Sequence, residues 1–165
     1  MKINLKYLPN KLTKKDKKKQ YKMLIKSRKF YKKGKYYTRK NISSFISTKS
    51  PHILKAKKIY NVNKIGSTNE LAKATGCSKI SLSKIINKGK GAYYSSGSRP
   101  NQTPQSWGIA RLASSITSGK AAAIDYSILE KGCQSNSKAL LLAKKSKNKY
   151  ANQTRKVPKQ IVKKI

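Results

Sequence analysis

The chain has 165 residues, of which 41 are Lys or Arg and four are Asp or Glu, so its formal net charge is +37 at pH 7. An excess of this size opposes compaction by self-repulsion and attracts polyanions, which makes nucleic acid or another anionic surface the default partner. No apolar run approaches the roughly 18 to 20 residues of a membrane span, and the start of the chain lacks the apolar region of a secretory signal. The composition therefore predicts an intracellular or packaged protein.

Basic residues are concentrated toward both ends of the chain. Residues 1–65 hold 22 of them, residues 66–134 hold nine and residues 135–165 hold ten, whereas three of the four acidic residues lie in the middle block. Codon drift toward an AT-rich genome favours lysine, but it does not explain why acidic residues are so few. The partition predicts a basic N-terminal arm over 1–30, a globular helical domain over 31–134 and a basic C-terminal arm over 135–165.

The first predicted element is a basic amphipathic helix that begins after Thr13 and ends at Gly34. Its apolar face would carry Tyr21, Leu24, Ile25 and Tyr31. It is either an ordinary helix docked on the core or an arm that contacts phosphates, through Lys14, Lys15, Lys17, Lys18, Lys19 and Arg28. The following segment, KYYTRKNISSFIS (35–47), mixes aromatic and β-branched residues, which predicts extended chain or a minor β element. Its Arg39 is a further candidate for binding.

Four later segments also have helix signals. Ser50 before Pro51 and Thr103 before Pro104 are typical of helix starts, and the segments 120–132 and 137–150 have helical periodicity. The second helix would align Trp107, Ala110, Arg111 and Ser114 on one face. The third would bury Ile124, Ile128 and Leu129. The last would be short and basic, with Lys144 and Lys145 as candidate contacts to nucleic acid or a partner.

The segment TNELAKATGCSKISLSKIIN (68–87) has the pattern of a helix-turn-helix. Leu71 and Leu82 would point inward from the two helices, and Gly76 would take the positive φ of the turn. As a DNA-reading unit, its second helix over 78–88 would present Lys79, Ser81, Ser83, Lys84 and Asn87 to the major groove. The alternative is a structural helical hairpin.

The segment KGKGAYYSSGSRPNQTPQSWG (88–108) differs from the rest of the chain. Its glycines and Pro100 predict a loop of about a dozen residues. Arg99, Asn101 and Gln102 would lie near a helix N-terminus, which suits phosphate or carboxylate. Arg99 and Arg111 could clamp a phosphate, or they could pair with Asp125 or Glu130, an alternative favoured for Arg111. The residues expected to be structural are Gly76, Tyr93, Tyr94, Trp107, Arg111 and Asp125, with the aromatic rings packing against helices that carry Leu82, Ile85 and Leu112.

Catalytic and metal chemistry lack the residue patterns that they need. Cys77 and Cys133 are too few and too far apart for a zinc site, and the single histidine, His52, adds little. Reduced, buried thiols are the interpretation that we favour, with one disulfide as the alternative. The chain has no nucleophile elbow, phosphate-binding glycine loop or pair of metal ligands. We therefore expect no enzymatic activity, no cofactor, no metal and no small-molecule substrate.

The strings GAYYSSGSRPNQT and SWGIARLAS, with KYYTRK and SPHILKAKKIY upstream, closely resemble an uncharacterised domain of nucleocytoplasmic large DNA viruses that infect algae and protists. The resemblance spans roughly residues 31–133. It implies an origin in an AT-rich giant virus, and it implies no activity. A virion location, and a host nucleus or cytoplasmic virus factory during infection, would follow.

Three functions from different classes remain open. The first is a virion-associated protein that binds viral DNA electrostatically during genome packaging or condensation. The second is a minor capsid or cement protein whose basic arms thread between viral capsid proteins. The third is a helix-turn-helix regulator. In each case the expected fold is mainly α: a small helical domain with basic arms.

Overall fold

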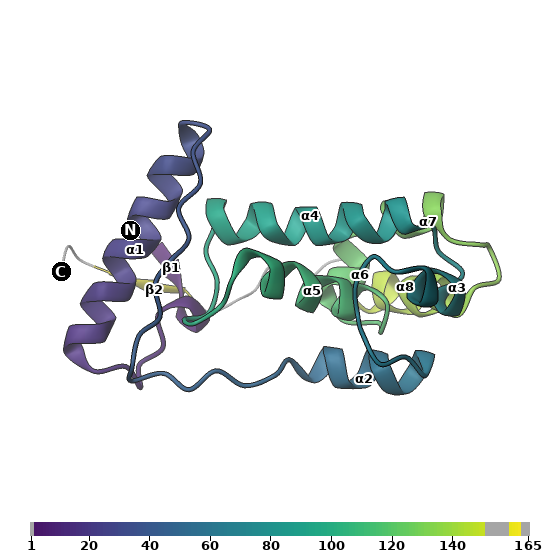
Figure 1. Cartoon of the computed structure of the whole chain (residues 1–165), viewed down its shortest axis with the longest axis horizontal. Helices are drawn as coiled ribbons and strands as arrows, with labels where there is room; N and C mark the ends of the chain where they lie inside the picture. The colour runs from purple at the N-terminus through teal and green to yellow at the C-terminus, as the bar shows by residue number, and fades with distance from the viewer. Residues whose placement is uncertain (1, 151–158, 163–165) are drawn as a thin grey trace. The chain divides into compact units, whose positions relative to one another are not determined.

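The computed structural model describes residues 2–150 and 159–162 and is mainly helical, as the sequence predicts (Figure 1). The chain forms two compact units. Unit 1 comprises the described residues of 1–48, 91–104 and 155–165, and unit 2 comprises those of 49–90 and 105–154. These boundaries differ from those expected at residues 30 and 134, because the segment 1–30 forms part of a packed unit. Among the described residues, no helix combines the length and apolarity needed to cross a bilayer.

Unit 1 contains a two-stranded sheet, a short 3-10 helix and one long helix. Its elements are β1 (Lys2–Asn4), η1 (Leu5–Tyr7), α1 (Lys14–Lys32) and β2 (Lys159–Ile161), together with the last turn of α4 (Lys79–Ser95). β1 pairs antiparallel with β2, with Lys2 opposite Ile161. The segment 35–47 forms extended chain and a turn without strand pairing, so the minor β element lies elsewhere than the sequence predicts.

Helix α1 begins and ends at the predicted signals. The Thr13 hydroxyl accepts a hydrogen bond from the Asp16 amide at 3.2 Å, which caps the N-terminus. At the other end Gly34 has a φ of 68°, and the amides of Gly34 and Lys35 donate to the carbonyls of Tyr31 and Phe30. This is the hydrogen-bond pattern of a Schellman turn, in which glycine avoids the cost of a left-handed conformation.

The buried face of α1 differs from the predicted one. Its buried residues are Asp16, Gln20, Met23, Leu24 and Ser27, so only Leu24 of the predicted stripe is buried. Tyr21 and Ile25 are half-buried, and Tyr31 is exposed. The core of unit 1 is formed by Ile3, Leu8, Leu12, Met23, Leu24, Ile42, Phe45 and Val162. A lysine-rich helix is thus held by a narrow contact stripe that leaves most of its circumference to solvent.

Among the described residues of unit 2, all of the named secondary-structure elements are helices. Its helices are α2 (Pro51–Tyr60), α3 (Asn69–Thr75), the first three turns of α4, α5 (Pro104–Ser115), α6 (Lys120–Ile124), α7 (Tyr126–Gly132) and α8 (Lys138–Tyr150). The predicted starts before Pro51 and Pro104 are confirmed. The segment 120–132 is two helices that meet at Asp125, and Ile124 is exposed rather than buried. The core is built around Leu71, Leu82, Ile85, Leu112, Ile116 and Leu129.

Helix α4 continues through residues that predict a loop, and close helix packing explains why. A Cβ atom added to Gly89 would lie 2.5 Å from the Cα of Gly108 in α5, and one added to Gly108 would lie 2.6 Å from the Ile86 carbonyl oxygen. Such approaches require glycine on both helices. Gly89 is therefore present because of helix packing in unit 2, and its lower helix propensity is outweighed by that contact.

Candidate nucleic-acid interface

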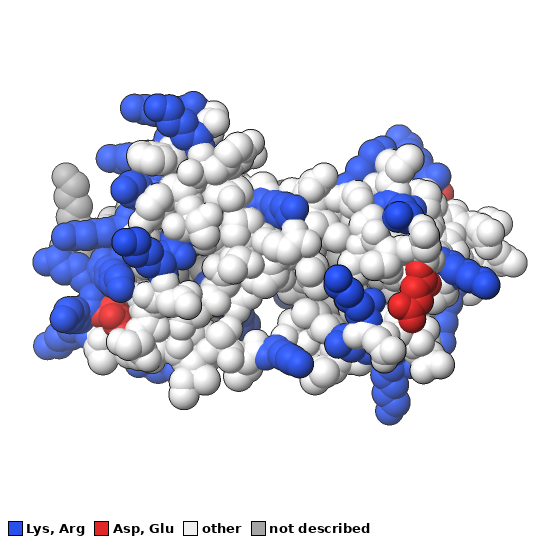
Figure 2. Space-filling view, viewed as in Figure 1, with Lys and Arg blue, Asp and Glu red and all other residues white. Residues whose placement is uncertain are grey.

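The exposed face of α1 is strongly cationic. Among its described residues unit 1 has 19 Lys and Arg residues against one acidic residue, and ten of the nineteen residues of α1 are basic. Figure 2 shows Lys and Arg side chains crowded over this helix. Eight of its nine lysines are exposed, namely Lys14, Lys15, Lys18, Lys19, Lys22, Lys26, Lys29 and Lys32. Within the part of the chain that the structure describes, none of the nine lysines pairs with a carboxylate.

Asp16 is the one acidic residue of unit 1, and its carboxylate is engaged by the 43–44 turn. The positive charge of α1 is therefore largely uncompensated. Its carboxylate accepts hydrogen bonds from the Ser44 amide at 2.8 Å and from the Ser43 hydroxyl at 3.4 Å. Hydrogen bonds from the hydroxyl and the amide of Ser44 lower the pKa of Asp16. The carboxylate thus ties the 43–44 turn to the first turn of α1, where a negative charge is favoured by the helix dipole.

A hollow of about 610 Å³ in unit 1 is lined by four cationic side chains and by none that is acidic. The cations are Lys2, Arg28, Lys29 and Lys32. The other polar lining comes from Asn4, Tyr7, Ser95 and Ser96. The Arg28 guanidinium donates to the Ser96 carbonyl oxygen from both Nε, at 3.0 Å, and Nη2, at 2.6 Å. A positive concave site with hydroxyl and amide donors suits a phosphate group.

Sequence reasoning identified only Arg28 of these four cations. Lys32 lies four positions after Arg28 and three after Lys29 on α1, and both separations are helical spacings that can be read from the sequence. The approach of Lys2 and of residues 95 and 96 depends on the fold of unit 1 and leaves no signal in the sequence. A second hollow, of about 500 Å³, contains Lys6, Lys11 and the exposed predicted residue Arg99.

Two residues predicted to bind a partner are instead internal to unit 1. Arg39 is buried, with 7% of its surface exposed. Its guanidinium donates to the Ser27 hydroxyl, the Tyr93 carbonyl and the Ser98 hydroxyl at 2.8 to 3.0 Å. It also lies 3.7 Å from the centre of the Tyr93 ring, and burial lowers its pKa from the usual arginine value. Arg39 therefore supports the fold of unit 1 and is inaccessible to a polyanion.

Asn101 is the second such residue. Its side chain accepts a hydrogen bond from the Ile42 amide and donates to the carbonyls of Ile42 and Phe45. It has a φ of 59°, a conformation that asparagine tolerates better than most residues. Asn101 therefore anchors the 42–45 segment through its amide group. Gln102 bonds the Ser47 hydroxyl nearby at 2.6 Å.

The aromatic residues of the 88–108 segment do not form the predicted common cluster. Tyr93 is fully buried, but its contacts include Arg39 and Tyr94 in unit 1, whereas Leu82, Ile85 and Leu112 form the core of unit 2. Trp107, in α5, is half-buried and lies outside that core. Buried residues of α5 are Gly108, Leu112, Ala113, Ser114 and Ser115, so its buried face also differs from the predicted one.

The segment predicted to form a helix-turn-helix folds as α3, a turn and α4. Thr68 caps α3 by accepting a hydrogen bond from the Leu71 amide, and Gly76 ends it with a φ of 70°. On α4, Lys79, Lys84 and Asn87 are exposed, whereas Ser81 is buried and bonds the Ser78 hydroxyl. Ser83 bonds the Ser67 hydroxyl at 2.7 Å. Two of the five side chains proposed to read bases are thus occupied within unit 2.

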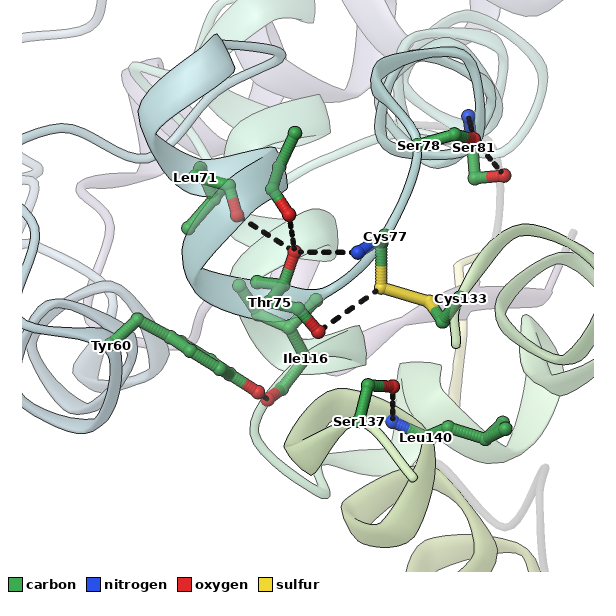
Figure 3. Close-up of a disulfide and its surroundings, with 11 residues drawn as sticks. Tyr60, Leu71, Thr75, Cys77, Ser78, Ser81, Ile116, Cys133, Ser137 and Leu140 are labelled. Carbon is green, nitrogen blue, oxygen red and sulfur yellow. Dashed lines mark hydrogen bonds between the residues drawn. A yellow bond between two sulfur atoms is a disulfide. The ribbon is translucent and has the colours of Figure 1, made fainter. Parts of the chain in front are cut away.

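A disulfide joins Cys77, in that turn, to Cys133 after α7 (Figure 3). The two residues form an isolated antiparallel bridge, flanked by hydrogen bonds from Ser78 to Gly132 and from Gln134 to Gly76. The expectation of reduced thiols is therefore wrong. The 56-residue separation of the two cysteines gives no indication in sequence that their backbones pair. Thr75, which accepts from the Cys77 amide and donates to the Leu71 carbonyl, completes the buried turn.

Arg111 pairs with Asp125, which is the alternative favoured from sequence. Asp125 is fully buried and also accepts from Lys88 and Ser115. Lys144 and Lys145 are exposed on α8, which packs into unit 2 through Ala139, Leu140 and Ala143. The described residues contain no cluster of His, Cys, Asp or Glu that could hold a metal ion. His52 is half-buried, and burial, with the nearby charge of Lys55, lowers its pKa.

Comparison with protein families gives a match over residues 4–138 to a family model described as a family of unknown function, DUF5824. The chain belongs to DUF5824. The matched range covers α1 through α7, and therefore both the cationic face of α1 and the Arg111–Asp125 pair of this DUF5824 member. No curated protein and no solved structure matches the chain.

Proposed function

We propose that this protein binds nucleic acid electrostatically, through the exposed face of α1 and the cationic hollow beside it, and that it has a non-enzymatic packaging or condensing role. The observation that carries the proposal is the charge of unit 1: its described residues include 19 Lys and Arg against a single aspartate that is hydrogen-bonded to the 43–44 turn. Long, exposed lysines on one helix face suit a phosphate backbone, because they can follow its regular charges without base contacts.

The sequence analysis assigns polyanion binding to basic arms, whereas this proposal assigns it to a folded surface. Helix α1 presents its lysines from a capped helix with a defined buried face, so their spacing is set before binding. Preorganised cations lose less conformational entropy on binding than those of a flexible tail. The viral and virion context implied by the family resemblance remains part of the proposal, with packaged viral DNA as the natural polyanion.

Salt-dependent binding by the full chain tests the proposal. We expect the affinity for a random-sequence DNA duplex, followed by fluorescence anisotropy, to fall linearly in log K against log salt. The slope should lose about 0.9 for each phosphate contacted, so several contacts would give a steep line. Poly-L-glutamate serves as the matched polyanion without phosphates, sugars or bases.

Two results would contradict the proposal. One is the absence of salt-sensitive binding to DNA at low ionic strength. The other is a higher affinity for poly-L-glutamate than for DNA at equal charge concentration, which would favour the acidic surface of a protein, as in a minor capsid or cement role. A clear sequence motif selected from random duplexes would instead support the regulator, with Lys79, Lys84 and Asn87 of α4 as the exposed candidates.

A further inference from the structure

Three tyrosines form an exposed aromatic cluster in unit 1 that neither the core nor the phosphate-binding surface explains. They are Tyr31 at the end of α1, Tyr36 after its Schellman turn, and Tyr94 in the last turns of α4. Tyr36 is 69% exposed and Tyr31 is 37% exposed, while Tyr94 is half-buried. None of the three belongs to the hydrophobic core of unit 1.

The Schellman turn creates this cluster. Because Gly34 has a positive φ, the chain reverses at the end of α1 and returns Tyr36 to the side of Tyr31. The two ring centres are then 6.2 Å apart, and the Tyr36 ring centre is 4.9 Å from that of Tyr94. A side chain at position 34 would meet no other atom within 4 Å, so conformation rather than space requires glycine there.

The cluster packs on Tyr93, which is itself anchored by Arg39. The ring of the fully buried Tyr93 meets that of Tyr94 edge-to-face at 5.1 Å, and the Arg39 guanidinium lies against the Tyr93 ring. The Tyr93 hydroxyl also accepts a hydrogen bond from the Arg39 amide at 2.9 Å. Tyr31 and Tyr94 are nearly parallel, with an interplanar angle of 7°. Fixed rings of this kind lose little entropy when a flat ligand stacks on them.

Cationic side chains border the rings. Lys32, Lys33 and Lys35 lie in the same turn as Gly34 and are all exposed. Exposed aromatic faces beside lysines are the combination that single-stranded nucleic acid needs, since its bases stack on the rings while its phosphates meet the cations. A duplex offers phosphates but keeps its bases stacked inside, and an acidic polypeptide offers charge without the flat faces of bases.

We propose that Tyr36, with Tyr31 and Tyr94, forms a stacking platform for unpaired bases, which gives this protein a preference for single-stranded over duplex nucleic acid. This inference rests on the proposed nucleic-acid binding and deepens it. The phosphate contacts set the salt-dependent affinity, and the platform adds a contribution that depends on the presence of bases. Tyr36 carries the test, because its high exposure allows replacement without loss of the fold.

The experiment compares three probes with the full chain at one salt concentration: an oligothymidine of about 12 nucleotides, an abasic strand of the same length and a duplex. The wild-type protein should bind oligothymidine more tightly than the abasic strand. Tyr36→Ala should weaken oligothymidine binding by at least about fivefold, the lower limit for one stacked base. The same variant should leave binding to the abasic strand and the duplex unchanged.

Two control variants make the result specific. Tyr36→Phe keeps the ring and should restore binding to oligothymidine, whereas Leu54→Ala removes an exposed large side chain from unit 2 and should have no effect. Equal wild-type affinity for the thymidine and abasic strands, with salt-sensitive binding to both, would overturn the platform and leave the proposed function intact. An equal loss on all three probes would also overturn it. Absence of binding to every probe would instead contradict the proposed function itself.

Discussion

Arg111 and Asp125 form a two-pronged ion pair inside unit 2, with Nε and Nη2 of the guanidinium donating to the two carboxylate oxygens at 2.9 and 2.8 Å. Lys88 Nζ reaches the same carboxylate at 2.8 Å, and the Ser115 hydroxyl reaches it at 3.0 Å. Asp125 is 0% exposed, so its charge is stabilised wholly by these donors. The contacts of Arg111 and Lys88 with Asp125 join α5 and α4 to the junction between α6 and α7.

We predict that Asp125→Asn destabilises unit 2. Removing one partner of a buried ion pair leaves the other without compensation, and the loss is about 3 to 5 kcal/mol. The lower end of this range applies here, because the Lys88 side chain is 45% exposed and its charge can be solvated when the carboxylate is removed. Trp107 is the only tryptophan and lies in unit 2, so its fluorescence during denaturant unfolding reports on this unit.

The control for this variant is Glu130→Gln, which removes an exposed carboxylate whose one hydrogen bond among the described residues is a long one, accepted from the Tyr126 hydroxyl. It should unfold within about 0.5 kcal/mol of wild type. Equal stability of Asp125→Asn and Glu130→Gln would show that the buried pair contributes nothing.

The same pair predicts a dependence of stability on acid pH. Burial alone would raise the pKa of Asp125, but hydrogen bonds and charge from Arg111 and Lys88 outweigh burial and hold the pKa below the ordinary value of 3.8. Because the folded pKa is the lower one, the stabilisation is complete above pH 3.8 and is lost as pH falls through the folded pKa. The stability gap between wild type and Asp125→Asn should therefore narrow progressively as the pH falls below about 3.8. A stability gap that widens in acid would contradict the assignment of a lowered pKa to folded Asp125.

Reduction of the Cys77–Cys133 disulfide should also destabilise unit 2. The bond spans 56 residues, and the chain-entropy estimate for a loop of that length is about 4 kcal/mol at 25 °C. Denaturant unfolding with and without reductant, followed by Trp107 fluorescence, measures the loss. The double variant Cys77→Ser with Cys133→Ser is the control, and its free energy of unfolding should be the same with and without reductant. Finding two reactive thiols in the denatured, unreduced protein would contradict the bond.

Replacement of Arg39 by lysine should lower the stability of unit 1 although the positive charge is kept. Arg39→Lys retains the positive charge but cannot donate to the Ser27 hydroxyl, the Tyr93 carbonyl and the Ser98 hydroxyl together. We expect a loss of about 2 kcal/mol or more, seen as faster amide hydrogen exchange in α1. Arg99→Lys changes an exposed arginine of the same unit and should leave exchange unaltered. Equal protection in the two variants would show that Arg39 is dispensable.

Local sequence signals predict much of the helical framework. Long-range contacts explain most of the differences between the predicted and the observed structure. Thr13, Gly34 and Gly76 act through their own backbone neighbours, so caps and turns are readable from sequence. Gly89 looks like a helix breaker until its contact with Gly108 is known. Arg39 looks like a surface cation, because the oxygens that receive its hydrogen bonds lie up to 59 residues away.

The candidate site likewise has features that can be read from the sequence and features that depend on long-range contacts. Lysine-rich α1 is evident from composition, and its exposure follows from the narrow buried stripe. The hollow that joins Lys2 to Arg28, and the platform that joins Tyr36 to Tyr94, each combine segments that are distant in the chain. Tyrosines interleaved with lysines were visible in sequence, but only the Schellman turn shows which of them share a surface.

A comparison of two charge variants, matched in size and in helical context, gives the sharpest test of binding through α1. One replaces four exposed lysines of α1, Lys14, Lys15, Lys18 and Lys22, with glutamine. The other makes the same change at four exposed lysines of α8, Lys138, Lys144, Lys145 and Lys149. Glutamine preserves helix propensity, so each variant removes four charges with little change in helix stability.

Duplex affinity is measured for both variants and wild type over a salt series. We expect the α1 variant to lose affinity, and we expect the magnitude of its slope of log K against log salt to fall by about 2 or more, since each lost phosphate contact removes about 0.9. The α8 variant should keep the slope of wild type to within about one contact. An equal fall in the two variants, or a larger fall in the α8 variant, would contradict the assignment of binding to α1.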